Sequence, residues 1–176
     1  EHFAASYDRG IAQIVSTRLV ADLETPVSAM LKLTRNAKYS FLLESVEGGA
    51  VRGRYSIIGM NPDLIWKVAG TSATINRSAL HDTDGPFIET GLDFVRLMEE
   101  LPEPNTDVLG LPDGIMIRPT VMAIFDSVRD EVTVTSPVYV DKAISARAAY
   151  ARASERITEV VDALDRPLDH STTQDA

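Results

Sequence analysis

Strand-like runs joined by turns of only a few residues most limit how this chain can fold. The clearest case is residues 115–125 and 131–140, two runs rich in β-branched and aliphatic side chains on either side of the polar turn 126–130. Turns this short join antiparallel strands, because parallel neighbours need a long crossover connection. The sequence therefore predicts an α+β fold, with mostly antiparallel sheet and flanking helices. It does not show the strand–helix alternation of a doubly wound parallel sheet.

Further strands are expected wherever a run of aliphatic and aromatic residues lies between turn formers. These runs are residues 11–20, 38–46, 54–59, 64–68 and 72–75. The turn Glu47-Gly48-Gly49 and the pair Asn61-Pro62 separate successive strands. Residues 81–91 contain turn formers without a periodic pattern, so we expect a loop there.

Helices are expected at residues 2–9, 26–34, 92–101 and 142–164. Thr25-Pro26 marks a helix start, because Thr can cap a helix and Pro at the first helical position loses no needed hydrogen bond. The last helix shows a 3.6-residue apolar period. Its predicted buried face is Ala146, Tyr150, Ala153, Ile157, Val160, Val161 and Leu164. Arg166-Pro167 ends it, and residues 169–176 are expected to form a flexible tail.

Composition argues against several classes of function. Lys and Arg number 17 and Asp and Glu 26, and this net charge of −9 repels nucleic acids and anionic membranes. Without cysteine there is no disulfide, thiolate metal site or cysteine nucleophile. Neither a membrane-length apolar run nor a signal-peptide pattern is visible, so we expect a cytoplasmic domain. The chain does not begin with Met, and we expect that it has been trimmed.

The residues by themselves reveal no catalytic centre. The three histidines lack the spacing of metal ligands. The glycine-rich segment at residues 48–55 resembles a phosphate loop only superficially, because Tyr55 stands where a small metal-binding hydroxyl is needed and the segment joins two strands. Acidic clusters at 99–100 and 126–131 lie at helix ends or turns, where solvation is favoured over metal binding.

Glu44 and Ser45 end an apolar strand. Because neighbours on a strand point to opposite faces, Ser45 is expected to share a face with Phe41 and Leu43, and Glu44 to lie on the other. A hydroxyl at the end of such a face can orient an amphipathic ligand. The alternative, favoured by the residues alone, is that Ser45 caps the turn before Gly48.

Segments spread along the chain carry a family resemblance. They include Thr25-Pro26-Val27-Ser28, Leu42-Leu43-Glu44-Ser45 and Gly53-Arg54-Tyr55-Ser56. With these segments in this order, the chain closely resembles the N-terminal domain of anthranilate synthase component I, over most of residues 2–165. Residues 109–113 and 118–120 are similar to a later part of that domain. The Leu-Leu-Glu-Ser segment also occurs in the related aminodeoxychorismate synthases, which remain the alternative within the family.

The resemblance implies a reaction carried out by a longer protein. The family converts chorismate and glutamine-derived ammonia into anthranilate and pyruvate, with Mg²⁺ and a glutaminase partner, component II. Its Mg²⁺ and chorismate residues lie in a C-terminal half. We therefore expect no catalytic residue or metal ligand in these 176 residues, and no activity from them alone. The family also has a few tens more residues between Glu89 and Asp93, so a segment is expected to be missing near 89–92.

Residues 1–168 then correspond to the regulatory domain, which in this family binds tryptophan as a feedback inhibitor. Carried over onto this sequence, Leu43, Glu44 and Ser45 contact tryptophan, and Arg54 faces its carboxylate. The ammonium, carboxylate and indole of tryptophan need an acceptor, a donor and an apolar slot, which this set of residues offers. A free-standing amino-acid-binding module is the alternative outside enzymes.

Overall fold

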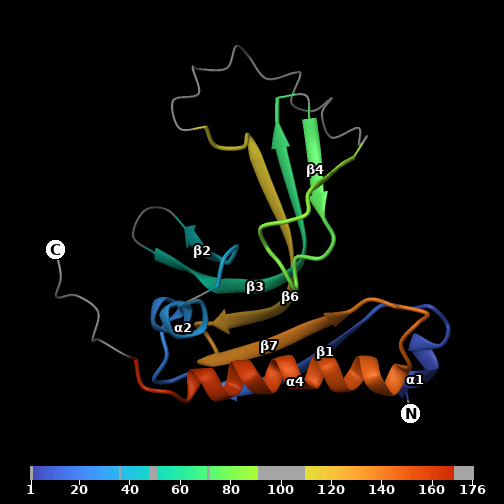
Figure 1. Ribbon diagram of the computed structural model, residues 1–176. Coiled ribbons are helices and arrows are strands. Elements are labelled where there is room, and N and C mark those ends of the chain that lie inside the picture. Colours follow the sequence, from blue (N-terminus) through green and yellow to red (C-terminus); the bar gives the residue numbers. More distant parts are fainter. Residues whose placement is uncertain (1, 36, 48–50, 71, 91–109, 169–176) are drawn as a thin grey trace. The chain divides into compact units, whose positions relative to one another are not determined.

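The computed structural model describes residues 2–35, 37–47, 51–70, 72–90 and 110–168 (Figure 1). Every strand pair with a resolved register is antiparallel, which confirms the predicted α+β class. The helices and strands are α1 (His2–Tyr7), β1 (Gln13–Val20), α2 (Pro26–Leu33), β2 (Phe41–Glu47), β3 (Val51–Ala69), β4 (Ser72–Asn76), β5 (Ile88–Glu89), β6 (Gly114–Asp126), β7 (Glu131–Val138) and α4 (Ala146–Leu164).

The chain divides into two compact units. The first comprises residues 1–60 and 120–176, and the second comprises residues 61–119. The strand order is β1-β7-β6-β3-β4-β5, with β2 paired to β3. Strands β3 and β6 each contribute one part to each unit, whereas β1, β2, β7 and the labelled helices belong to the first.

The predicted hairpin of β6 and β7 forms the centre of the first unit. Phe125 lies opposite Val132 and Asp126 opposite Glu131, and β1 extends the pairing along β7. Side chains alternate between the two faces of each strand. On one face, Val132 and Val134 are buried in a core that also contains Phe125. This core fixes the end of the hairpin, where residues 127–130 make the turn.

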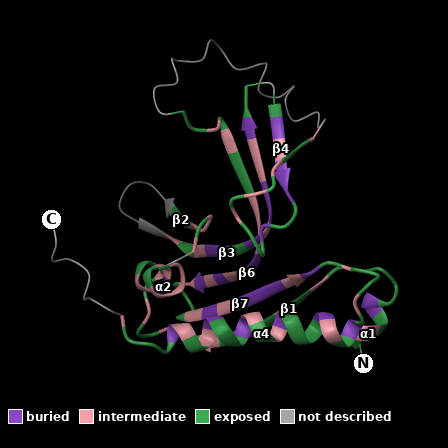
Figure 2. Cartoon of the chain, in the orientation of Figure 1, coloured by how far each residue is buried: buried purple, intermediate pink, exposed green. Residues whose placement is uncertain are grey.

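Helix α4 covers that face of the sheet, running alongside β7 and β1 (Figures 1 and 2). It begins after Ser145, whose side chain accepts a hydrogen bond from the Ala148 amide. Its buried residues are Ala146, Ala149, Ala153, Ile157, Val160 and Leu164. The prediction was wrong for Tyr150, which is 48% exposed and packs edge-on against Phe3, while the smaller Ala149 faces the sheet.

The helix start predicted at Thr25-Pro26 is confirmed. Thr25 and Ser28 form a reciprocal capping box: the Ser28 amide donates to Thr25 Oγ1 at 3.0 Å, and the Thr25 amide donates to Ser28 Oγ at 2.9 Å. Two amides that the helix itself cannot satisfy are thereby paired. At the other end of α2, Lys32 Nζ donates to the Leu164 carbonyl at 2.8 Å and ties this helix to the end of α4.

Asn61-Pro62 does not separate two strands as predicted, because β3 runs through both residues. Asn61 adopts a φ of +52°, a conformation that asparagine tolerates better than most residues, and Pro62 is buried. The boundary between the two units falls immediately before this pair. The irregularity is therefore absorbed within the strand where it passes from one unit to the other.

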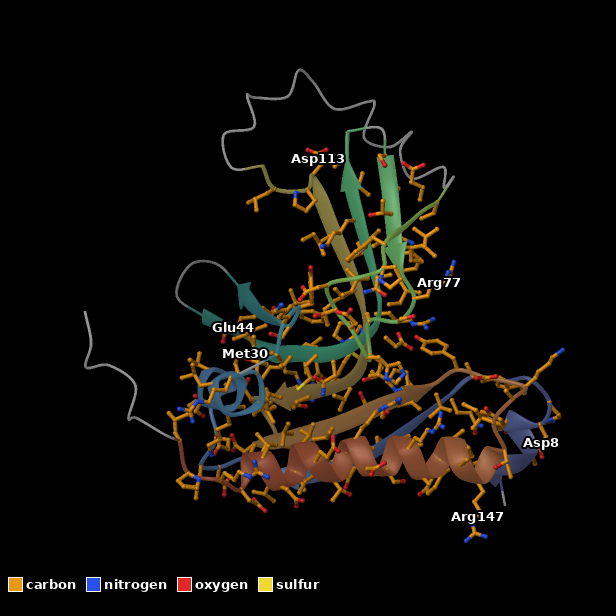
Figure 3. All side chains as sticks on the ribbon, viewed as in Figure 1. Asp8, Met30, Glu44, Arg77, Asp113 and Arg147 are labelled. Atoms are coloured by element: carbon orange, nitrogen blue, oxygen red, sulfur yellow. The ribbon has the colours of Figure 1, made fainter. Side chains whose placement is uncertain are left out.

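In the second unit, β3 turns into β4 through Gly70, whose φ of +55° favours glycine. The Gly70 amide donates to the Asp113 carboxylate at 2.6 Å, and Asp113 is labelled in Figure 3. The loop expected at 81–91 contains a short strand, β5, paired with β4. The helix predicted at 92–101 and the tail predicted at 169–176 lie outside the described residues.

Candidate ligand-binding site

A cavity of about 360 Å³ opens in the first unit where β2, β3, the β6–β7 turn and the start of α2 meet. Three of the four residues predicted to bind a ligand line it, namely Glu44, Ser45 and Arg54. Figure 3 shows Glu44 of β2 above Met30 of α2, and both of these elements contribute to the wall. The other lining residues are Ala21, Asp22, Glu24, Thr25, Pro26, Gly53, Ser56, Phe125, Asp126, Ser127, Asp130 and Glu131.

A shift in strand pairing brings Glu44 and Ser45 to the same cavity. Glu44 pairs with Ser56, but Val46 pairs with Arg52, so the register changes between them. Neighbours alternate only along a regular strand, and such an irregularity redirects a side chain. The prediction that Glu44 and Ser45 lie on opposite faces was therefore wrong, because both residues line the same cavity. Gly53 accommodates the shift, because a Cβ there would overlap the Ser45 side chain.

Arg54 is held on the cavity wall by Asp126. Its Nε donates to Asp126 Oδ1 at 3.0 Å and its Nη2 to Asp126 Oδ2 at 2.8 Å, a two-point contact between β3 and the end of β6. The hydrogen bond from Arg54 is the main cause that lowers the pKa of Asp126 from its usual 3.8 to about 2. The same hydrogen bond raises the pKa of Arg54 above its usual value.

The start of α2 forms a further part of the cavity wall. Thr25 and Pro26 line the cavity and belong to the capped first turn. Glu24, which precedes them, accepts a hydrogen bond from Ser28 Oγ at 2.8 Å and pairs with the largely buried ammonium of Lys32. These contacts fix the helix end at which the cavity opens.

Leu43, the fourth predicted residue, does not line this cavity. Leu42 packs against the core on one side of β2, and Leu43 alternates to the other side, where it is 59% exposed. Sequence reasoning missed Phe125 and Asp126, which lie 80 and 81 positions from Ser45 in the sequence and join it at the cavity only through sheet pairing. The Thr25-Pro26 signal located a helix start but gave no indication that it borders a site.

The charge of the cavity favours a cationic ligand group. Three of its six carboxylates have nearby cationic partners: Asp126 pairs with Arg54, Glu24 with Lys32 and Glu131 with Arg18 at 3.7 Å. The other three carboxylates have no ion-pair partner among the described residues. They are Asp22, Glu44 and Asp130. Exposed carboxylates of this kind accept hydrogen bonds from an ammonium group.

Metal binding finds no support in the part of the chain that the structure describes. There, no group of three or more His, Asp or Glu side chains is arranged to hold a metal ion. Likewise, no helix within the described ranges is both long and apolar enough to cross a membrane.

Comparison with known proteins finds several relatives that share one name, although no family model matches the chain. It is 44% identical to anthranilate synthase component 1 of Cereibacter sphaeroides over 199 residues, which cover 94% of the chain and 40% of that protein. The corresponding protein of Synechocystis is 30% identical over 205 residues, covering 98% of the chain and 40% of the relative. That of Thermus thermophilus is 34% identical over 142 residues, covering 67% and 30% respectively.

Two features of these matches concern length. The chain spans about two fifths of the length of the first curated relatives it matches. The matched stretches of 199 and 205 residues exceed the 176 residues of the chain, so these relatives carry residues within the match that the chain lacks. By sequence, the chain is similar to about two fifths of the length of anthranilate synthase component 1 proteins.

Proposed function

We propose that this chain is the tryptophan-sensing N-terminal part of an anthranilate synthase component I. The observation that supports this most is the convergence of Glu44, Ser45 and Arg54 on one cavity. The sequence alone predicts these three residues as ligand contacts, through their resemblance to the family's tryptophan site. Two strands and a register shift are needed to bring them together.

The cavity has the size and chemistry for one amino acid. Its volume of about 360 Å³ lies at the small end of the range for ligand pockets, roughly 300–1,000 Å³. In the proposed complex, Glu44 accepts from the ligand ammonium, Ser45 contributes a hydroxyl, and Arg54 donates to the carboxylate. Phe125 and Pro26 offer the apolar and aromatic contact that an indole ring prefers.

The reaction itself is proposed for the full-length protein, as the resemblance implies. That protein would convert chorismate, with glutamine or ammonia, to anthranilate and pyruvate in the cytoplasm, with component II as the glutaminase partner. Mg²⁺ would support that chemistry. The described residues of this chain do not form a site that fits the ion, so we assign it no ligand here.

Two alternatives remain in view. The first is aminodeoxychorismate synthase component I, because the Leu42-Leu43-Glu44-Ser45 segment is shared with that family. The second is an amino-acid-binding module that acts without a catalytic half. Chorismate turnover by the full-length chain, with the product identified, separates the first alternative from anthranilate synthase. The length of the encoded reading frame separates both enzymes from the second.

Calorimetric titration of the chain with tryptophan tests the proposed function. We expect saturable binding of one tryptophan per chain and weaker binding of phenylalanine. Glu44→Gln should weaken tryptophan binding, since it removes a charged acceptor at the cavity. Asp82→Asn, an exposed carboxylate in the second unit that does not line the cavity, is the matched control. Absence of binding to the wild-type chain, or equal losses in both variants, would contradict the proposal.

A further inference from the structure

We propose that Asp126 is a positioning residue that orients Arg54 for the carboxylate of the ligand. This inference rests on the proposed function, because it assigns a task to a residue of the same cavity. The family resemblance does not mark Asp126 as a ligand contact. Its role follows from how the structure holds the Arg54 side chain and main chain.

Arg54 is fixed at both ends. At its tip, Asp126 receives two hydrogen bonds, of 3.0 and 2.8 Å, from Nε and Nη2. At its main chain, the Arg54 carbonyl accepts from the Ser127 amide at 2.9 Å and from Ser127 Oγ at 3.1 Å. Asp126 is the last residue of β6 and Ser127 follows it in the turn, so one short segment sets the position of the whole arginine side chain.

The two-point contact leaves part of the guanidinium available. A guanidinium has five N–H donors, and Asp126 engages two of them. Within the described residues, Nη1 makes no hydrogen bond. The guanidinium carbon also lies 4.9 Å from the centre of the Tyr55 ring, which further limits where the side chain can move. A ligand carboxylate can therefore bind to Nη1 while Asp126 keeps its own contact.

Asp126 has two opposing effects on an anionic ligand group. Its charge offsets that of Arg54, which weakens the attraction to a carboxylate. Its two hydrogen bonds also restrict a side chain that otherwise has large rotamer freedom, so that less entropy is lost when the ligand binds. Without Asp126, the guanidinium has other carboxylates of the same cavity as alternative partners, including Glu44 and Asp130. The fixed orientation of the guanidinium contributes more to binding than the offset of its charge removes. Loss of Asp126 therefore weakens carboxylate binding.

The test compares tryptophan with tryptamine, which has the same indole and ammonium but no carboxylate. Each is titrated calorimetrically into the wild-type chain and into Asp126→Asn. The asparagine keeps an Oδ1 acceptor for the Val128 amide, which donates to Asp126 at 3.1 Å, and for Arg54 Nε. The turn therefore retains its hydrogen bond, and the variant removes the carboxylate charge and the Oδ2 acceptor of Arg54 Nη2. Asp130→Asn is the matched control, because it removes one negative charge from the same turn and cavity without touching Arg54.

We expect Asp126→Asn to weaken tryptophan binding by about five- to tenfold more than tryptamine binding, a factor that corresponds to a fraction of the rotamer entropy of an arginine. The loss of one negative charge affects the ammonium group that the two ligands share, whereas the loss of orientation affects only the carboxylate of tryptophan. Asp130→Asn should change the affinities of both ligands by a similar factor. Equal losses for the two ligands in Asp126→Asn, no loss, or tighter tryptophan binding would overturn the positioning role alone. If the wild-type chain binds neither ligand, the proposed function fails and this inference fails with it.

Discussion

Among the residues of the cavity, Arg54 and Asp126 form the contact with the clearest electrostatic consequence. The hydrogen bonds from Arg54 stabilise the ionised carboxylate and lower the pKa of Asp126 to about 2. A carboxyl group whose pKa is lower in the folded state stabilises the fold above its unfolded pKa, near 3.8, and loses that contribution as the pH falls towards 2. The ion pair is therefore complete throughout the physiological range.

We predict that the Asp126 carboxyl titrates with a midpoint near pH 2, as measured from its ¹³C chemical shift. Arg54→Gln should raise the midpoint towards 3.8, because the causes that lower it come mainly from the guanidinium. Arg129→Gln, which changes a more distant cation at 4.0 Å, should move it less. A wild-type midpoint near 3.8 would show that the two-point contact does not persist in solution.

Ser45 distinguishes a ligand contact from a turn cap. We predict that Ser45→Ala weakens tryptophan binding about tenfold to a hundredfold, the value of one buried hydrogen bond to a charged group, and that Ser45→Phe weakens it further by filling the cavity. Melting temperature should change little in Ser45→Ala, because Ser45 is exposed. A variant that melts earlier and binds tryptophan normally would instead support the cap.

At the scale of elements, the first turn of α2 holds one wall of the cavity in place. The capping box between Thr25 and Ser28 supports that turn. We predict that Thr25→Ala lowers the free energy of unfolding by about 0.5–2 kcal/mol, as measured by urea denaturation, because it leaves a helix-terminal amide without its partner. Thr158→Ala is the control: its hydroxyl bonds back to the Ser154 carbonyl within α4, so its loss should cost little. Equal effects would argue against the capping role.

Elements with a strong local pattern could be predicted from the sequence. Turns, caps and periodicity within a few residues determine the β6–β7 hairpin and the starts of α2 and α4. The structure confirms the predicted hairpin and the predicted start of α2 at Pro26. The second start was expected four residues too early, because Ser145, which caps α4, was not recognised. Continuity of β3 through Asn61-Pro62 was missed, since local turn propensity is overridden there by pairing and burial.

The candidate site was only partly predictable, for a physical reason. Glu44, Ser45 and Arg54 lie close in sequence and belong to motifs with a family resemblance. Asp126 meets Arg54 across 72 positions of the chain, and that contact exists only after β3 and β6 come together. Acidic residues in a turn are usually solvated, so the sequence carried no signal that this one holds an arginine.

At the scale of the whole molecule, the sheet face opposite α4 in the first unit carries exposed apolar side chains. Ile14 is 66% exposed, Val20 75% and Leu43 59%, and each alternates with a residue that packs against the core. A surface of this kind is typical of a region that another protein segment covers. The chain spans about two fifths of the length of its relatives. We therefore expect the remaining part of a full-length protein to cover this sheet face.

We predict that the 176-residue chain binds a hydrophobic fluorescent dye and self-associates as its concentration rises. The triple variant Ile14→Thr, Val20→Thr, Leu43→Thr should reduce both effects without lowering the melting temperature, because these side chains are mostly exposed. Val128→Thr, another exposed aliphatic residue but in the hairpin turn, serves as the control. A wild-type chain that stays monomeric and binds no dye would count against an uncovered apolar face.

The central claim is that the cavity beside Ser45 binds tryptophan, and amide NMR spectra of the ¹⁵N-labelled chain during a tryptophan titration test it most directly. We predict saturable shifts that are largest for the amides of Glu44, Ser45, Arg54 and Ser127, with one common dissociation constant. Ser45→Phe should abolish these shifts while leaving the rest of the spectrum intact. No saturable shift, or shifts confined to the second unit at residues 61–119, would contradict the claim.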